Sequence, residues 1–284
     1  MNIYKRRKII NHLMCSIVFF CTLVTLVPLI SILGFVLSKG ISSLNVDFFI
    51  HLPRPVGEPG GGMSNAIVGS LILIGLSCLW AIPVGILGGI YLSEFGKNKV
   101  GTVVRFTADV LNGIPSIVIG IFAYALFVLP MKTFSAISGG FALGIIMIPT
   151  VMRATEEMLR MVPQTLREAA LALGISQFRT TVSIVLKTAL PGILTGILLA
   201  IARIAGETAP LLFTALGNRF WQQGLAQPIA ALPLQIFAYA ISPYDDWHRQ
   251  AWAGAFVLIV IVFLTSLISR LVIGLRYARF KAQR

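Results

Sequence analysis

The sequence is poor in charged residues. Only 12% of its 284 residues are Asp, Glu, Lys or Arg, whereas 57% are hydrophobic. A soluble domain of this length carries about 25% charged residues. The shortage of charge therefore excludes an ordinary soluble domain, and we expect an all-α, polytopic membrane protein.

Cysteine and histidine are also scarce. The three cysteines all lie inside apolar runs: Cys15, Cys21 and Cys78. An odd number of cysteines in such runs does not form a disulfide framework. The three histidines are far apart: His12, His51 and His248. Their spacing resembles no metal site, so we expect no metal and no cofactor. No apolar run holds a histidine at its core or a pair of aspartates, which argues against an intramembrane hydrolase.

The chain also lacks a nucleotide-binding motif. The pattern G-x-x-x-x-G-K-[ST] is absent, because Gly96-Lys97 has neither the upstream glycine nor the following Ser or Thr. The net charge of +13 comes from basic residues at the ends of apolar runs, without a basic stripe interleaved with aromatics. We therefore expect neither intrinsic ATP hydrolysis nor nucleic-acid binding.

Six apolar runs are long enough, or nearly so, to cross a bilayer at about 20 residues each. They are Leu13–Leu37, Asn65–Leu92, Ala108–Pro130, Gly139–Met152, Leu190–Leu216 and Ala251–Ile273. The fourth run is short, and we expect its helix to continue through ATEEMLR. KRRK before the first run resembles the start of a signal peptide, but that run is too long and lacks a cleavage pattern. We interpret residues 1–64 as an anchor helix with an outer loop, and residues 65–284 as the core.

The basic residues predict the orientation. If both termini are cytoplasmic, the cytoplasmic segments hold 17 Lys and Arg residues and the outer segments hold five. The opposite orientation would reverse this bias, and cytoplasmic loops are the ones enriched in Lys and Arg. We therefore expect a multi-pass membrane protein with both termini in the cytoplasm.

One apolar run carries charges near its middle. Gly192–Leu212 reads GILTGILLAIARIAGETAPLL, with Arg203 close to the midpoint. An arginine at the bilayer centre costs about 2.5–3.5 kcal/mol on insertion scales. Arg203 and Glu207 are four residues apart, so they share a helix face and can pair. We expect this face, with Gly192, Gly196 and Ala200, to point into the bundle.

Two interpretations of this pair remain open. In the structural one, Arg203 and Glu207 form a buried ion pair that pins helices together, although such pairs add little stability. In the functional one, which we favour, the Arg203 guanidinium binds an anionic solute through its forked donors. Glu207 then either holds Arg203 when the site is empty or faces the solute itself. Ionisable groups within membrane spans usually mark a solute pathway.

The stretch Asn112-Gly113-Ile114-Pro115-Ser116 is a second candidate. Asn-Gly interrupts a helix and Pro-Ser restarts one, so the new helix would direct free N–H groups, with Asn112 and Ser116 nearby, at an anion. The alternative is an ordinary start of the third span.

The most polar helical segment lies at about residues 153–187, between the fourth and fifth runs. Pro163 and Gly174 bound the short helical pattern LREAALALG, as expected for helix ends. Leu166, Ala170 and Leu173 recur at helical spacing beside Arg167 and Glu168. The pattern predicts an amphipathic helix that docks into a partner, or one that rests on lipid headgroups.

This segment resembles the EAA loop of permeases of binding-protein-dependent ABC importers. The residues that match in register are Glu168, Ala169, Ala170, Gly174, Ile184 and Leu186. Lys187 stands where the family pattern has Pro. The resemblance implies a MetI-like bundle of the type I importer class, in which Arg167–Leu173 is the coupling helix that sits in a groove of an ATPase subunit.

The second half of the chain is similar to permeases of phosphate importers. LLAIARIAGETAPLLFTALGN, QPIA and DWHRQAWAGA carry the likeness, which extends from LNGIPSIVIGIF through most of the remaining chain. It implies that Arg203 and Glu207 act in phosphate translocation. It also implies the partners: a second similar permease, two ATP-binding subunits and an extracytoplasmic phosphate-binding protein.

The rival interpretation is a secondary transporter of a small anion driven by an ion gradient. The sequence shows no inverted-repeat signature of that class, and such a carrier would leave the polar loop unexplained. A channel would need a filter motif or rings of charge, and neither TVGYG nor NPA occurs.

Overall fold

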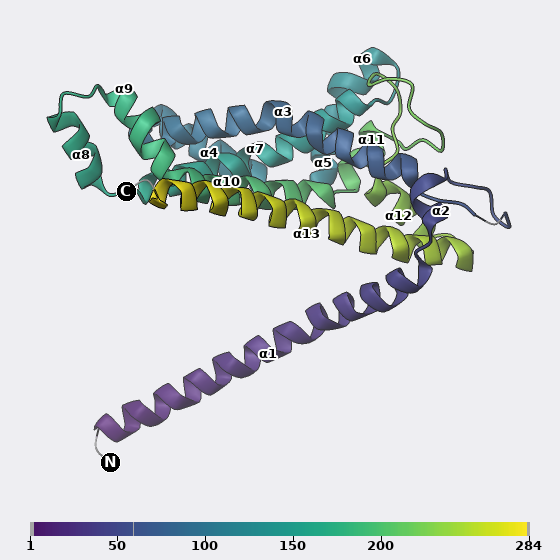
Figure 1. The fold of residues 1–284 in the computed structure, drawn as a ribbon, viewed down its shortest axis with the longest axis horizontal. Helices are drawn as coiled ribbons and strands as arrows, with labels where there is room; N and C mark the ends of the chain where they lie inside the picture. The colour runs from purple at the N-terminus through teal and green to yellow at the C-terminus, as the bar shows by residue number, and fades with distance from the viewer. Residues whose placement is uncertain (1–2, 59, 283–284) are drawn as a thin grey trace.

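The computed structural model describes residues 3–58 and 60–282, with side chains described up to residue 268 and at residue 271. Within this part of the chain the regular elements are helices, joined by short loops (Figure 1). In chain order they are α1 (Ile3–Ser43), α2 (Val46–Ile50), α3 (Ser64–Glu94), α4 (Lys99–Gly113), α5 (Ser116–Ala123), the π-helix η1 (Tyr124–Val128), α6 (Leu129–Met131), α7 (Ala136–Arg160), α8 (Gln164–Ala172), α9 (Gln177–Thr180), the π-helix η2 (Thr181–Val185), α10 (Leu186–Ala205), α11 (Ala209–Thr214), α12 (Leu232–Ala240) and α13 (Asp245–Ala282).

The centre of the bundle is α7, which packs against α3 on one side and α10 on another. Glycines allow the close approach: a Cβ added at Gly85 of α3 would lie 2.7 Å from the Cβ of Val151. On α10, the same addition at Gly196 would collide with Ala154. Small residues at four-residue spacing let membrane helices pack closely, and these glycines confirm the expected bundle packing.

Five helical segments are long and apolar enough to cross a membrane, and a sixth is counted if one bent pair forms a single span. The expected continuation of the fourth run is confirmed, since α7 reaches Arg160. Two predicted spans are wrong as continuous helices. The chain bends by 103° between α4 and α5, inside the predicted span Ala108–Pro130. The predicted span Leu190–Leu216 is interrupted after Ala205.

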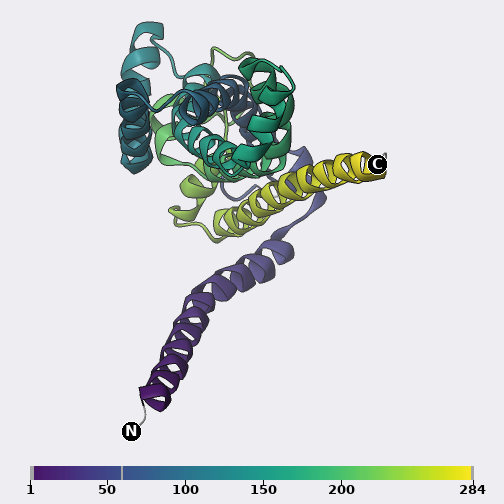
Figure 2. The same ribbon diagram turned by 90° about the vertical axis from the view of Figure 1, so that its left-hand side faces the viewer.

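Helix α1 projects away from the bundle (Figures 1 and 2). Its contact with the rest lies near its C-terminal end, where Gly40 packs against Phe256 and Trp252 of α13. Most of its apolar side chains are exposed. This surface suits lipid or another membrane subunit, as expected for an anchor helix.

The bundle has two ends, which carry different elements (Figure 1). We call one the α8 end; there α3 and α7 finish and α8 and α9 form a protruding hairpin. We call the other the α12 end; α2, α12 and the first turns of α7 and α13 gather there. At that end Asn65 donates a hydrogen bond to the backbone of Asn218, and Ser70 accepts one from the Leu232 amide. These bonds attach loop 215–231 to α3.

Candidate functional site

Arg203 occupies the last turn of α10, and Glu207 lies just beyond the helix. The Gly206 amide donates to the Arg203 carbonyl and the Glu207 amide to that of Ile204, at 3.3 and 3.2 Å. The helix stops because Gly206 is flexible and Pro210 has no N–H to continue the ladder. Arg203 is therefore at a break in the span, and the expected midpoint of an unbroken helix is wrong.

The charged pair is close but loose. Arg203 Nε and Glu207 Oε1 are 4.0 Å apart, and the two side chains are 42% and 18% exposed. A guanidinium carries five N–H donors. At this separation the pair leaves most of the Arg203 donors available to another oxyanion.

We predicted that one face of α10 points into the bundle. This prediction is confirmed for the small residues of that face and is wrong for Arg203. Gly192, Gly196 and Ala200 face α7 or the buried core, and Ile204 continues that line four residues on. Arg203 immediately precedes Ile204, so its side chain points about 100° away from that of Ile204 around the helix axis. It lies on an exposed stripe with Leu199, so its guanidinium faces outward from this subunit.

The second candidate stretch is a break and a restart, as predicted. α4 ends at Gly113, and α5 begins at Ser116 with Pro115 as its N-cap. The Val118 amide donates to the Pro115 carbonyl at 2.9 Å. The Asn112 side-chain oxygen accepts a hydrogen bond of 3.4 Å from the Thr150 hydroxyl of α7. The 103° bend is therefore tied to the central helix.

The two breaks lie at similar depth along α7. Gly192 opposes Met158 and Gly196 opposes Ala154, so α10 runs antiparallel to α7. Continued, this register places Arg203 near residue 147, three residues from Thr150, which is about 4.5 Å along the axis. The restarted helices also touch, since a Cβ added at Gly120 of α5 would lie 2.7 Å from Pro210 of α11. The structure thus brings the stretches around Arg203 and Ser116 to one level.

The predicted docking helix is α8, at the far end of α10 from Arg203. Pro163 precedes it and Gly174 follows it with φ of 76°, a conformation that favours glycine. Glu168 and Ala169 are exposed, and Ala170 is buried. Leu173 is 81% exposed. The outward face of α8 therefore combines an acidic residue with apolar ones.

Arg167 differs from its neighbours on α8. Its side chain is 14% exposed and turns toward α3, where Nη1 lies 2.5 and 2.6 Å from the two carboxylate oxygens of Glu94. Its Nη2 donates to the Leu159 carbonyl at 2.8 Å. The sequence analysis missed Glu94. A lone acidic residue ending an apolar run was a signal for a buried ion pair.

A second unpredicted charge cluster surrounds Glu156 of α7, whose side chain is 1% exposed. It contacts Arg105 at 2.6 Å, Arg160 at 2.7 Å and Arg153 at 3.0 Å. Arg153 also pairs with Asp109 of α4 at 3.0 Å. Arg105 donates to the backbone carbonyls of residues 92 and 96 as well. The cluster fastens α4 across the ends of α3 and α7.

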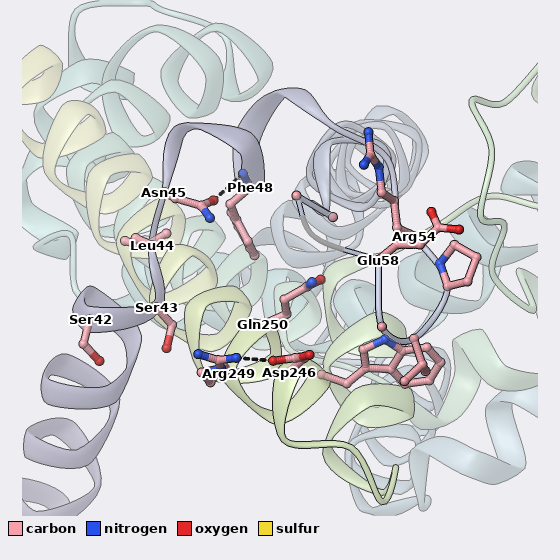
Figure 3. A pocket seen from close by; sticks show the side chains of 16 residues that line it. Ser42, Ser43, Leu44, Asn45, Phe48, Arg54, Glu58, Asp246, Arg249 and Gln250 are labelled. Carbon is pink, nitrogen blue, oxygen red and sulfur yellow. Dashed lines mark hydrogen bonds and ion pairs between the residues drawn. The ribbon is translucent and has the colours of Figure 1, made fainter.

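Two cavities lie at opposite ends of the bundle. One, of about 660 Å³, lies at the α8 end and is lined by Glu94, Arg167 and Thr181 among others. The other, of about 510 Å³, lies at the α12 end (Figure 3). Its lining carries charges of both signs, and Arg249 pairs there with Asp246. Neither cavity contains Arg203 or Glu207 among the residues lining it.

This arrangement of helices is that of an ABC importer permease of the MetI-like type. It is shared with the alginate ABC transporter, at 13% identity and a TM-score of 0.65, over 95% of this chain and 96% of that one. It is shared also with the MetNI methionine transporter, at 18% identity and a TM-score of 0.59, over 75% and 96%. At these identities the likeness establishes the fold alone.

The sequence defines the family. Residues 81–275 match the model of the binding-protein-dependent transport system inner membrane component. The chain is 47% identical over 271 residues to the phosphate transport system permease protein PstA of Xylella fastidiosa, covering 95% of this chain and 94% of that protein. It is 44% identical to PstA of Haemophilus influenzae, over 93% and 94%, and 36% identical to PstA 1 of Mycobacterium tuberculosis, over 94% and 90%. The chain belongs to the binding-protein-dependent transport system inner membrane component family.

Proposed function

We propose that this chain is one permease half of an ATP-driven phosphate importer in a bacterial cytoplasmic membrane. The observation that carries the proposal is the loosely held Arg203, placed at a break in a span of a chain closely related to phosphate permeases. Charged residues within membrane spans commonly mark a solute pathway.

In this proposal Arg203 binds phosphate as it passes the middle of the membrane. A guanidinium matches the oxygens of phosphate through two parallel hydrogen bonds. Its partner Glu207 lies 4.0 Å away, so their attraction is weak enough for a doubly charged oxyanion to displace the carboxylate at low cost. Glu207 therefore acts as the counter-ion between transport events.

The start of α5 supports the same proposal. The first amides of a helix have no intrahelical acceptors, and the helix dipole favours an anion there. Ser116 adds a hydroxyl to these amides, and Asn112, near the end of α4, adds an amide group from the other side of the bend. Since the breaks of both spans lie at similar depth, the restarted α5 would present its donors close to the level of Arg203.

The energy would come from separate ATP-binding subunits that dock at α8. Glu168, Ala169 and Leu173 are exposed there, and an amphipathic helix with one apolar face fits a groove in a partner. Ala170 and Gly174 shape the helix and its end. The bias of Lys and Arg toward this end supports a cytoplasmic location for α8 and for both termini.

A second, similar permease would complete the pathway. Arg203 and Leu199 face outward from this subunit, so a facing half would enclose them between the two chains. An extracytoplasmic phosphate-binding protein would deliver phosphate at the α12 end. Closure of the two ATP-binding subunits would then move α8 and switch the pathway between its outward and inward openings.

Uptake of labelled phosphate by proteoliposomes that contain the whole complex tests this proposal. We expect uptake only when ATP is present on the side of the ATP-binding subunits and the loaded binding protein is on the other side. Uptake that follows an imposed ion gradient and ignores ATP would instead establish a secondary transporter.

A further inference from the structure

Helix α8 stands at the edge of a hollow. The cavity of about 660 Å³ is lined by residues from the ends of α3 and α7, from α8 and from the start of the next span. The backbone of α8 lies close to α9 and η2, which follow it in the chain. The chain joins α8 to α7 through residues 161–163, whereas the contact of α8 with α3 is made by side chains at this hollow.

Arg167 makes that link with its whole guanidinium. One nitrogen lies within 2.6 Å of both Glu94 oxygens and another donates to the Leu159 carbonyl. The Glu94 side chain is 7% exposed. Charge-assisted hydrogen bonds are stronger than neutral ones, and the bonds from two nitrogens to two different elements fix the orientation of the guanidinium. A pair buried to this degree also resists separation, because either charge left alone would be desolvated without a partner.

Glu94 also contacts the span that follows α8. The Thr181 hydroxyl lies 3.4 Å from its second carboxylate oxygen. Thr181 opens the π-helix η2, which continues without interruption into α10. π-Helical turns are often found at functional positions within helices. The same carboxylate therefore contacts α8, belongs to α3 and reaches the base of the helix whose last turn carries Arg203.

We propose that Glu94 is a positioning residue that transmits the displacement of α8 into α3 and α10. The inference rests on the proposed function and concerns how its two ends are connected. Two neighbouring residues of α8 have different roles in this proposal. Glu168 is exposed and faces the ATP-binding subunit, whereas Arg167 faces inward and pairs with Glu94. Without the Glu94 carboxylate, α8 can move with the ATP-binding subunit while α3 and α10 keep their positions.

The ratio of phosphate transported to ATP hydrolysed tests this role. In reconstituted complexes, Glu94→Gln keeps the side-chain shape and removes the charge that holds Arg167. We expect assembly and ATP hydrolysis to persist, with uptake per ATP reduced at least tenfold. Lys97→Gln, at an exposed basic residue lining the same hollow, is the matched control, and its ratio should equal that of the wild type.

A second variant keeps the test decisive if Glu94→Gln fails to assemble. Thr181→Val has nearly the same shape and removes the hydroxyl, which contacts Glu94 at 3.4 Å and the Gln177 carbonyl one turn earlier at 3.0 Å. We expect this variant to lower uptake per ATP several-fold. The proposal is overturned if an assembled Glu94→Gln complex transports as much phosphate per ATP as the wild type. If only Thr181→Val assembles, a wild-type ratio of phosphate transported to ATP hydrolysed in that variant overturns it. A purely structural bond would lower assembly and leave the ratio intact. If the wild type itself shows no ATP-dependent uptake, the proposed function fails instead.

Discussion

At the scale of single residues, the tightness of its ion pair distinguishes Arg203 from several other arginines of this chain. Arg105, Arg153 and Arg167 each reach a carboxylate and are no more than 31% exposed. Arg203 is 42% exposed and its carboxylate lies at the outer limit of an ion pair. Tightly paired guanidiniums have few donors left. Arg203 is therefore suited to bind a solute, whereas the others fix helices in place.

The buried carboxylate of Glu156 provides a test at this scale. Glu156→Gln leaves three arginines around a neutral group, and we expect the free energy of unfolding to fall by about 1–3 kcal/mol. The partners' partial exposure keeps the effect below that of a fully buried pair. The thermal midpoint of the purified complex in detergent measures it.

The adjacent Glu157 is exposed and supplies the control. Glu157→Gln should leave the free energy of unfolding within about 0.5 kcal/mol of the wild type, as is usual for surface substitutions, and the midpoint nearly unchanged. Equal midpoints for the two variants would show that the cluster around Glu156 does not fasten α4 to α7.

At the scale of elements, apolar run length located the spans, and local residue chemistry determined where they break. Asn-Gly and Pro-Ser in the stretch 112–116 predicted a break in the helix, and α4 ends and α5 begins within this stretch. The break after Ala205 was missed because the run Gly192–Leu212 is long enough to cross a bilayer as one helix despite Arg203 and Glu207, although Gly206 and Pro210 were visible signals. Contacts such as Arg167 with Glu94 join residues 73 positions apart, which no local pattern specifies.

The packing of α10 on α7 gives the prediction for this scale. Gly196→Leu places a side chain where even a Cβ collides with Ala154. We expect it to destabilise the subunit by about 1–3 kcal/mol and to reduce uptake, because α10 also positions Arg203. Thermal unfolding and uptake of the same preparation measure both effects.

Gly75→Leu is the matched control for this packing variant. Gly75 is also a helical glycine, on α3, but a Cβ there would meet nothing within 4 Å. Its uptake and thermal midpoint should stay close to those of the wild type. An equal loss in both variants would mean that leucine disturbs any helical glycine and that the α7 contact has no special importance.

At the scale of the whole molecule, the chain connects α8, which we propose docks the ATP-binding subunit, to Arg203 at a break in a span. α8 lies at one end of the bundle, and α10 runs about 30 Å from that end toward its interior, at 1.5 Å for each of its 20 residues. Arg203 lies in the last turn of this helix, and Glu94 contacts its base. A movement of α8 can therefore reach the level of Arg203 through one continuous helix.

The exposed faces indicate that the subunit works within a larger assembly. α1 projects from the bundle with its apolar side chains uncovered. Arg203 also faces outward. An isolated arginine facing lipid would be costly. A second permease half that covers Arg203 removes this cost and encloses the pathway.

The most direct test of the central claim is phosphate uptake by complexes that carry Arg203→Gln. The complex is assembled with its ATP-binding subunits and loaded binding protein, and uptake of labelled phosphate is measured with and without ATP. Losing charge-assisted hydrogen bonds to phosphate should lower ATP-dependent uptake at least about tenfold, while Arg203→Lys, which keeps the charge without the fork, retains an intermediate rate. Uptake by an assembled Arg203→Gln complex at the wild-type rate would contradict the account and leave Arg203 a structural partner of Glu207.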